Sequence, residues 1–281
     1  MRVAMRLPPA LQSFDTANLR LRLISSAFMA PIVLLAVYLG GLAYGAVLTC
    51  ALTIGLYEWL RLVAPGTRTQ TVSFACAMLV VLMTGGLLFS TACGAVLGTV
   101  FTFVLFFLSR RDHNEQASWV ALGIPYMGIS GLALLALRAT PNNGAALVFY
   151  LLITVWSTDV GAFAAGRLIG GRKLAPTLSP NKTWAGLFGG MALAFVVGYL
   201  MASLLGAKHP EVALVLSPVL AAVAQGGDLF ESALKRRSGV KESGDLIPGH
   251  GGILDRIDGL VFVGIFVFLF QTTIGTWINW W

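Results

Sequence analysis

Long apolar segments constrain the fold of this chain more than any other feature of its sequence. A helix needs about 17 to 25 predominantly apolar residues to cross the hydrocarbon core of a bilayer. The sequence therefore predicts an all-α integral membrane protein with about nine transmembrane helices. The predicted spans are Leu23 to Gly41, Leu42 to Val63, Thr71 to Phe89, Ala92 to Ser109, Ser118 to Leu137, Ala145 to Gly166, Ala185 to Ala207, Val212 to Phe230, and Gly259 to Trp277.

The composition supports this fold class and excludes others. Hydrophobic residues make up 57% of the chain and charged residues only 11%, whereas about a quarter of the residues of soluble proteins are charged. The net charge of +7 comes from basic residues that border apolar spans, which favours lipid headgroups over nucleic acid as a partner. Cys50, Cys76 and Cys93 lack metal-ligand spacing and are predicted to be packing residues.

The distribution of positive charge predicts the orientation of the spans. If the N-terminus is cytoplasmic, all 19 Lys and Arg residues except Arg138 and Lys208 fall on the cytoplasmic side, as the positive-inside rule requires. The C-terminus then lies outside. Trp277, Trp280 and Trp281 are consequently predicted at the outer membrane interface.

Polarity divides the chain into three regions. Residues 1–22 are predicted to be a cytoplasmic N-terminal segment, residues 23–140 a transmembrane scaffold, and residues 141–281 a transmembrane catalytic region. The last region contains two long polar loops on the predicted cytoplasmic side, residues 167–184 and 231–258.

Carboxylates beside the last two spans are the strongest candidates for chemistry. Asp228 lies at the end of the eighth span, where an ionisable residue is a functional candidate by default. If that helix continues, Glu231, Ser232 and Lys235 share one face with Asp228. A surface ion pair is the alternative interpretation of Glu231 and Lys235.

A second carboxylate pair, Asp255 and Asp258, precedes the ninth span. Carboxylate oxygens suit hard cations such as Mg²⁺, so we predict Asp228 and Asp255 as metal ligands from neighbouring helices. In the alternative interpretation, Arg256 only neutralises these neighbours. The preceding glycines, Gly251 and Gly252, are suited to a phosphate cradle formed by backbone amides.

The other polar loop carries groups that suit phosphate or nucleotide contact. These are the hydroxyl groups of Ser179 and Thr183 and the ammonium of Lys182. Composition alone favours a role of this basic loop in membrane topology. Asp159, just before it, lies inside the sixth span and requires pairing or access to water.

The polar residues of the C-terminal half form two blocks of sequence. The first runs from Ser232 to Asp258 and contains S-A-L-K-R, Lys241 and P-G-H-G-G-I-L-D-R-I-D; the second is S-P-N-K-T-W-A-G, from Ser179 to Gly186. Both blocks resemble one known family, the CDP-diglyceride synthetases or phosphatidate cytidylyltransferases. The blocks cover much of the C-terminal half, and the first hundred residues match only in hydropathy. Glu242 replaces the aspartate of the family signature, and Asn181 and Ala185 replace residues that are often polar or charged.

The resemblance implies that CTP and phosphatidate react to give CDP-diacylglycerol and pyrophosphate, with Mg²⁺ at the site. It leaves open whether a monovalent cation assists and whether the chain forms a homodimer. The other partner is membrane lipid, and the implied location is the bacterial cytoplasmic (inner) membrane with the site facing the cytoplasm. We predict as catalytic residues Asp228, Lys235, Arg236, His250 and Asp255. We predict as substrate-binding residues Ser179, Lys182, Thr183, Ser232, Lys241, Gly251, Gly252, Arg256 and Asp258.

Two other functions are consistent with a membrane site for anions. A CTP-dependent polyisoprenol kinase would transfer the γ-phosphate of CTP instead of the cytidylyl group. A transporter of anionic solutes is the alternative outside enzymology, but such proteins commonly contain internal repeats. We find no internal repeat in this sequence.

Overall fold

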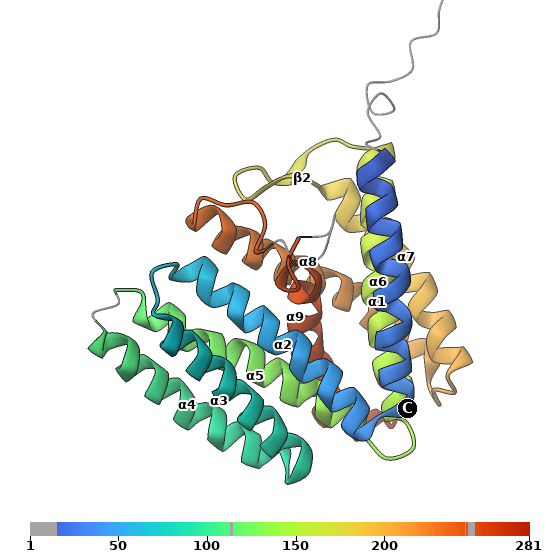
Figure 1. Ribbon diagram of the computed structural model, residues 1–281. Coiled ribbons are helices and arrows are strands. Elements are labelled where there is room, and N and C mark those ends of the chain that lie inside the picture. Colours follow the sequence, from blue (N-terminus) through green and yellow to red (C-terminus); the bar gives the residue numbers. More distant parts are fainter. Residues whose placement is uncertain (1–15, 113–114, 245, 247–250) are drawn as a thin grey trace, which may run out of the picture.

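The structure is a computed structural model that describes residues 16–112, 115–244, 246 and 251–281. Long helices form most of this described part (Figure 1). They are α1 (Thr16–Leu39), α2 (Gly41–Val63), α3 (Thr69–Leu88), α4 (Thr91–Arg111), α5 (Ala117–Arg138), α6 (Gly144–Leu168), α7 (Trp184–Leu204), α8 (Ala213–Arg237) and α9 (Leu254–Phe270).

The helices confirm the prediction of an all-α integral membrane protein. Within the described residues, eight helices are long and apolar enough to cross a membrane, and a shorter apolar segment, Ala27–Leu39, lies in α1. The ninth span extends beyond α9 through a π-helical turn, Gln271–Gly275, into the short helix α10 (Thr276–Ile278). The orientation predicted from the positive charges stays a prediction.

Two predicted boundaries differ from the structure in ways that matter for the site. Helix α8 ends at Arg237 instead of Phe230, and α9 begins at Leu254 instead of Gly259. Hydropathy detects only the part of a helix that is soluble in lipid, whereas Lys, Arg and Glu are good helix formers and extend α8 beyond it. The charged ends of both helices are therefore helical, which fixes the directions of their side chains.

A β-hairpin is the other departure from the predicted pattern. Strands β1 (Lys173–Ala175) and β2 (Ser179–Thr183) pair antiparallel within the first polar loop, where we expected no regular structure. Thr183 ends the hairpin and begins α7, because its hydroxyl accepts a hydrogen bond from the Gly186 amide at 3.0 Å. This N-cap ties the hairpin to a membrane helix.

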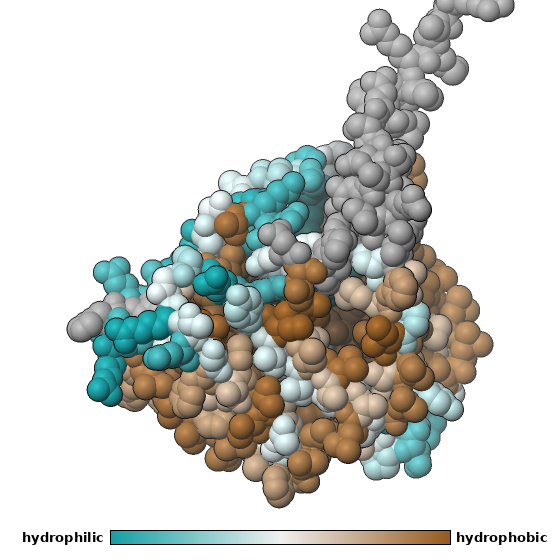
Figure 2. All heavy atoms as spheres, viewed as in Figure 1, coloured by the Kyte–Doolittle hydropathy of each residue, from teal (hydrophilic) through white to brown (hydrophobic). Residues whose placement is uncertain are grey.

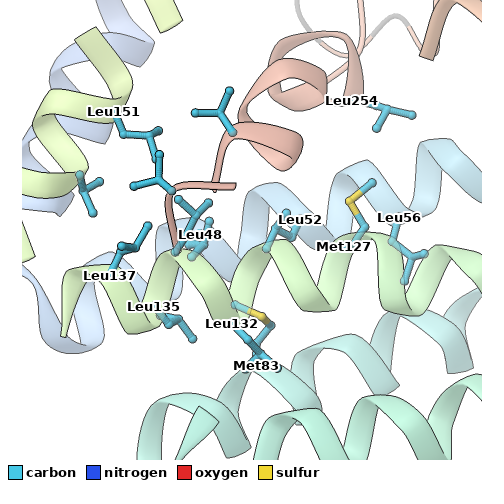
Figure 3. Close-up of a cluster of buried hydrophobic side chains, with 14 of the residues drawn as sticks. Leu48, Leu52, Leu56, Met83, Met127, Leu132, Leu135, Leu137, Leu151 and Leu254 are labelled. Atoms are coloured by element: carbon cyan, nitrogen blue, oxygen red, sulfur yellow. The ribbon is translucent and has the colours of Figure 1, made fainter. Parts of the chain in front are cut away.

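Helix α9 is central in the arrangement. It packs against α2, α5, α6 and α8, while α3 and α4 pack against α5 on one side and α7 packs against α6 on the other. The core between α2, α5 and α9 consists of buried aliphatic and methionine side chains, including Leu52, Leu56, Met127 and Leu254 (Figure 3). The N-terminal helices thus share one core with the helix that carries Asp255 and Asp258.

Much of the outer surface is apolar, as a protein surrounded by lipid requires. Figure 2 shows hydrophobic side chains over most of the helices and hydrophilic ones around the β1–β2 hairpin. Of the three tryptophans predicted at the outer interface, only Trp277 is largely exposed. Trp280 and Trp281 are buried and pack edge-on against Tyr150 of α6, so they stabilise the bundle instead of facing lipid headgroups.

Close backbone contact between α6 and α7 predicts the effect of one substitution. A Cβ at Gly161 would overlap the Gly189 carbonyl, whereas a Cβ at Gly226 of α8 would meet nothing within 4 Å. We expect Gly161→Ala to destabilise the protein by about 1–3 kcal/mol through overpacking. Gly226→Ala should be neutral or stabilise it by up to about 1 kcal/mol through helix propensity. Thermal unfolding in detergent measures both, and equal effects of the two substitutions would contradict the contact.

Candidate active site

Helix α8 presents the predicted polar face at its charged end. Because the helix continues to Arg237, the side chains of Asp228, Glu231, Ser232 and Lys235 lie along one face. The Ser232 hydroxyl donates to Asp228 at 3.4 Å, and the Lys235 ammonium donates to Glu231 at 2.7 Å. The predicted stripe is confirmed, and its members contact one another.

Small residues bring α9 against this face of α8. A Cβ at Gly227 would overlap the Asp258 backbone, and Gly259 packs against Ala224. This close approach places carboxylate oxygens of Asp228, Glu231 and Asp258 within 4.8 Å of one another. Two helices thus form one acidic group, which we call the carboxylate cluster.

Lys235 links the carboxylate cluster to Asp255. Its ammonium lies 2.6 Å from one Asp255 oxygen and 2.7 Å from Glu231. The other Asp255 oxygen accepts hydrogen bonds from the backbone amides of Ser243 and Gly252, at 3.1 and 2.9 Å. The Glu231 and Lys235 pair is therefore not a surface pair, since their side chains are only 1% and 13% exposed.

The hairpin brings the second sequence block to the same place. Lys182 on β2 forms an ion pair with Asp228 at 2.5 Å and donates to Gln225 of α8 at 2.6 Å. Helix α6, which carries Asp159, packs against α8. Residues far apart in the sequence thus meet around Asp228, whose side chain remains 37% exposed and is accessible to a ligand.

The remaining predicted residues lie around this centre with differing contacts. Arg236 is exposed and donates to the carbonyls of Leu178 and Val240, at 3.1 and 3.2 Å, so it anchors the hairpin to α8. Ser179 pairs with Ala175 at the start of β2.

Of three further predicted residues, two are exposed and one lies outside the described residues. Lys241 and Arg256 are exposed. His250 lies outside the described residues, so its predicted role stays a prediction.

The two glycines of the first block are explained by the carboxylates beside them. Gly251 has a φ of 77°, in the left-handed region, and a Cβ there would approach Asp255. A Cβ at Gly252 would overlap Ser243 and the carboxylate of Glu58. The Gly252 amide donates to Asp255, and whether this turn also binds a phosphate stays a prediction.

The carboxylate cluster fits a divalent cation. One Glu231 oxygen is buried and has no hydrogen-bond partner among the described residues, which is costly unless another group satisfies it. Mg²⁺ prefers oxygen ligands and usually binds one or two protein carboxylates. The contacts of Asp255 do not exclude it as a ligand, since a carboxylate has about four lone-pair sites.

Glu58, Gln225 and Ser243 contact the site but were not predicted from the sequence. Glu58 of α2 accepts hydrogen bonds from the Ser243 hydroxyl and from backbone amides at the start of α9. It is an ionisable residue inside an apolar span, which is the criterion that selected Asp159 and Asp228. Applied to the first three spans, that criterion would have found it.

Comparison with known proteins identifies the family. Residues 20–274 match the model of the cytidylyltransferase family. The chain belongs to this family. The match extends into the N-terminal half, where the sequence blocks alone had indicated only similar hydropathy.

Several bacterial relatives of this cytidylyltransferase family member carry one name. The phosphatidate cytidylyltransferase of Brucella suis biovar 1 is 39% identical over 258 residues, which cover 90% of this chain and 93% of that protein. That of Bacillus subtilis is 39% identical over 155 residues, or 55% of this chain and 58% of the relative. That of Haemophilus influenzae is 43% identical over 143 residues, or 49% and 50%.

The carboxylate cluster predicts a divalent-cation effect on stability. A ligand at 100 times its dissociation constant stabilises the folded state by about 2.7 kcal/mol, so we expect Mg²⁺ to raise the unfolding temperature. Asp228→Asn should remove most of this increase. Asp112→Asn removes a carboxylate that pairs with Arg68 away from the cluster and should retain the increase. Thermal unfolding in detergent with Mg²⁺ or a chelator measures it; an equal increase in both variants would exclude Asp228 as a ligand.

Proposed function

We propose that this chain is a phosphatidate cytidylyltransferase, which converts CTP and phosphatidate into CDP-diacylglycerol and pyrophosphate for phospholipid biosynthesis. One observation carries the proposal. The two sequence blocks that resemble this family meet in space, because Lys182 of the second block contacts Asp228, next to the first block. The names of the relatives support the same activity.

The reaction requires little proton transfer. A phosphate oxygen of phosphatidate attacks the α-phosphorus of CTP, a new P–O bond forms, and the bond to the bridging oxygen breaks as pyrophosphate leaves. Phosphate monoesters have a second pKa of about 6, so the nucleophile is already largely deprotonated at neutral pH. The site must instead align two anions and offset their repulsion.

The residues of the site supply both parts of this task. Lys182 and Lys235 bring ammonium groups to the edge of the carboxylate cluster, where they can contact phosphate oxygens. Asp228, with Glu231 and Asp258 of the carboxylate cluster, would hold Mg²⁺, and Asp255 beside Lys235 is the further ligand that the sequence predicts. When bound, Mg²⁺ supplies positive charge to the phosphate oxygens of the reacting groups.

The place of the site in the fold suits a lipid substrate and a nucleotide. The site lies where α8 and α9 meet the hydrophilic hairpin, so phosphatidate can remain in the bilayer while CTP enters from water. We propose that this face is cytoplasmic, as the positive-inside rule predicts, and that the membrane is the bacterial inner membrane. Residues 141–281 would then form the catalytic region and residues 23–140 its scaffold.

Incubation of the purified protein with phosphatidate and α-labelled CTP tests the activity directly. We expect label to enter the lipid phase and pyrophosphate to be released, and a chelator should stop both. Parallel reactions with γ-labelled CTP and a polyisoprenol test the kinase alternative. Transfer of γ-label to that lipid, without transfer of α-label to phosphatidate, would overturn the proposal.

Lys235 provides a sharper test of the site. We expect Lys235→Ala to lower kcat by about 10²-fold or more, because it removes a charge placed to stabilise the transition state. The substitution also leaves Glu231 and Asp255 without their shared cation, which destabilises the fold. The value of kcat is therefore calculated per folded protein molecule. Lys208→Ala is the matched control, since Lys208 contacts Asn279 on the exposed surface. Loss of less than about 10-fold would indicate a binding role.

A further inference from the structure

Glu58 is a buried carboxylate at the charged end of α2, outside both sequence blocks. Its residue is only 4% exposed. One carboxylate oxygen accepts a hydrogen bond from the Ile253 amide at 3.0 Å. The other accepts from the Leu254 amide at 2.7 Å and from the Ser243 hydroxyl at 3.1 Å. Three donors from the segment that leads into α9 thus converge on one side chain of another helix.

The contacts of Glu58 differ from those of a buried ion pair. Among the described residues, none of the ion pairs includes Glu58. Burial of a charge without compensation is very costly, and here backbone amides supply the compensation. The N-terminus of a helix carries a partial positive charge and unsatisfied amides, which match a carboxylate in both charge and hydrogen bonding.

Glu58 supplies a cap that α9 does not supply itself. Ile253 stands at the N-cap position of α9, and no side-chain hydrogen bond is made from that position. A helix is usually capped by the side chain of the residue at its own N-cap position. The carboxylate from α2 takes this role across 195 and 196 residues of sequence, so it fixes where α9 begins relative to α2.

Glu58 is linked to the proposed catalytic residue Asp255 through one intervening residue, Ser243. Ser243 donates its hydroxyl to Glu58 and its backbone amide to Asp255. Gly252 is similarly placed, because its amide donates to Asp255 and its Cα faces the Glu58 carboxylate. The turn that precedes α9 is therefore held between two carboxylates, one from α2 and one from α9.

We propose that Glu58 is a positioning residue of the active site, an inference that rests on the proposed function. It holds the first turn of α9 so that Asp255 meets Lys235 and Asp258 completes the carboxylate cluster. Glu58 acts through these residues and its carboxylate is occupied by the turn. Its loss should therefore reduce turnover and weaken the response to the divalent cation, with little effect on the KM for CTP.

Two variants test this role in the full chain in detergent. Glu58→Gln keeps the shape but replaces one acceptor oxygen with an NH₂ group that faces backbone donors. Asp112→Asn is the matched control, since it also neutralises a carboxylate in the N-terminal half that contacts Arg68 and Thr71. Wild type and variants are assayed with α-labelled CTP and phosphatidate over a range of Mg²⁺ concentrations.

We expect Glu58→Gln to lower kcat by about 10-fold or more and to raise the Mg²⁺ concentration for half-maximal activity by a similar factor, as substitutions beside metal ligands commonly do. The KM for CTP should change by less than about threefold, because both Glu58 oxygens already accept hydrogen bonds from Ser243, Ile253 and Leu254. Asp112→Asn should match wild type. An unchanged kcat and Mg²⁺ response in Glu58→Gln would overturn the proposal.

Hydrogen exchange measured by mass spectrometry gives a readout that does not depend on activity. In Glu58→Gln, the peptide that contains the amides of Ile253 and Leu254 should exchange faster, while peptides of α4 and α7 should be unchanged. Faster exchange throughout the chain, with normal kcat per folded molecule, would overturn the positioning role. If Glu58→Gln does not fold, Ser243→Ala removes one of its hydrogen bonds, and an unchanged Mg²⁺ response there would overturn it too.

Failure of the proposed function is distinguishable from failure of this inference. Wild-type protein that transfers no α-label would refute the function, whatever the behaviour of the variants. Active wild-type protein with normal Glu58→Gln kinetics would refute only the role of Glu58.

Discussion

The buried contact of Lys235 with Glu231 and Asp255 is the interaction on which the site depends. One ammonium joins a carboxylate of α8 to a carboxylate of α9, and removal of one partner from a buried ion pair commonly costs about 3–5 kcal/mol. Small residues between the helices permit this contact, and the contact in turn keeps Asp228 beside Asp258. Packing and electrostatics therefore specify the same helix pairing.

This arrangement concentrates negative charge where the proposed substrates are also negative. Asp228, Glu231 and Asp258 lie together, and Lys182 and Lys235 contact them without matching their number. The cation that we propose would offset the repulsion between these carboxylates and phosphate, whereas a purely basic site would hold pyrophosphate after the reaction. The mixture of carboxylates and ammonium groups suits a reaction that must bind two anions and release another.

Hydropathy and spacing predicted the long helices and the polar face of α8, because both follow from local sequence. The β-hairpin was not predicted, since its contacts with α8 depend on Lys182 reaching a helix 43 residues away. Glu58 was missed for a related reason. As an acidic residue in an apolar span, Glu58 is itself visible in the sequence, but its partners are mostly backbone amides, which carry no sequence signal, so only the fold shows that it faces the start of α9.

The cap that α2 provides for α9 has a consequence for how separable the parts of this protein are. The start of α9, in the first sequence block, donates hydrogen bonds to a side chain of the N-terminal half, so the two halves share buried contacts. A chimaera that joins the N-terminal half of one relative to the C-terminal half of another would have to preserve the contact between Glu58 and Gly252, just before α9. A chimaera joined between α5 and α6 would take Glu58 from one relative and Gly252 from the other, although neither residue lies near the junction in the sequence.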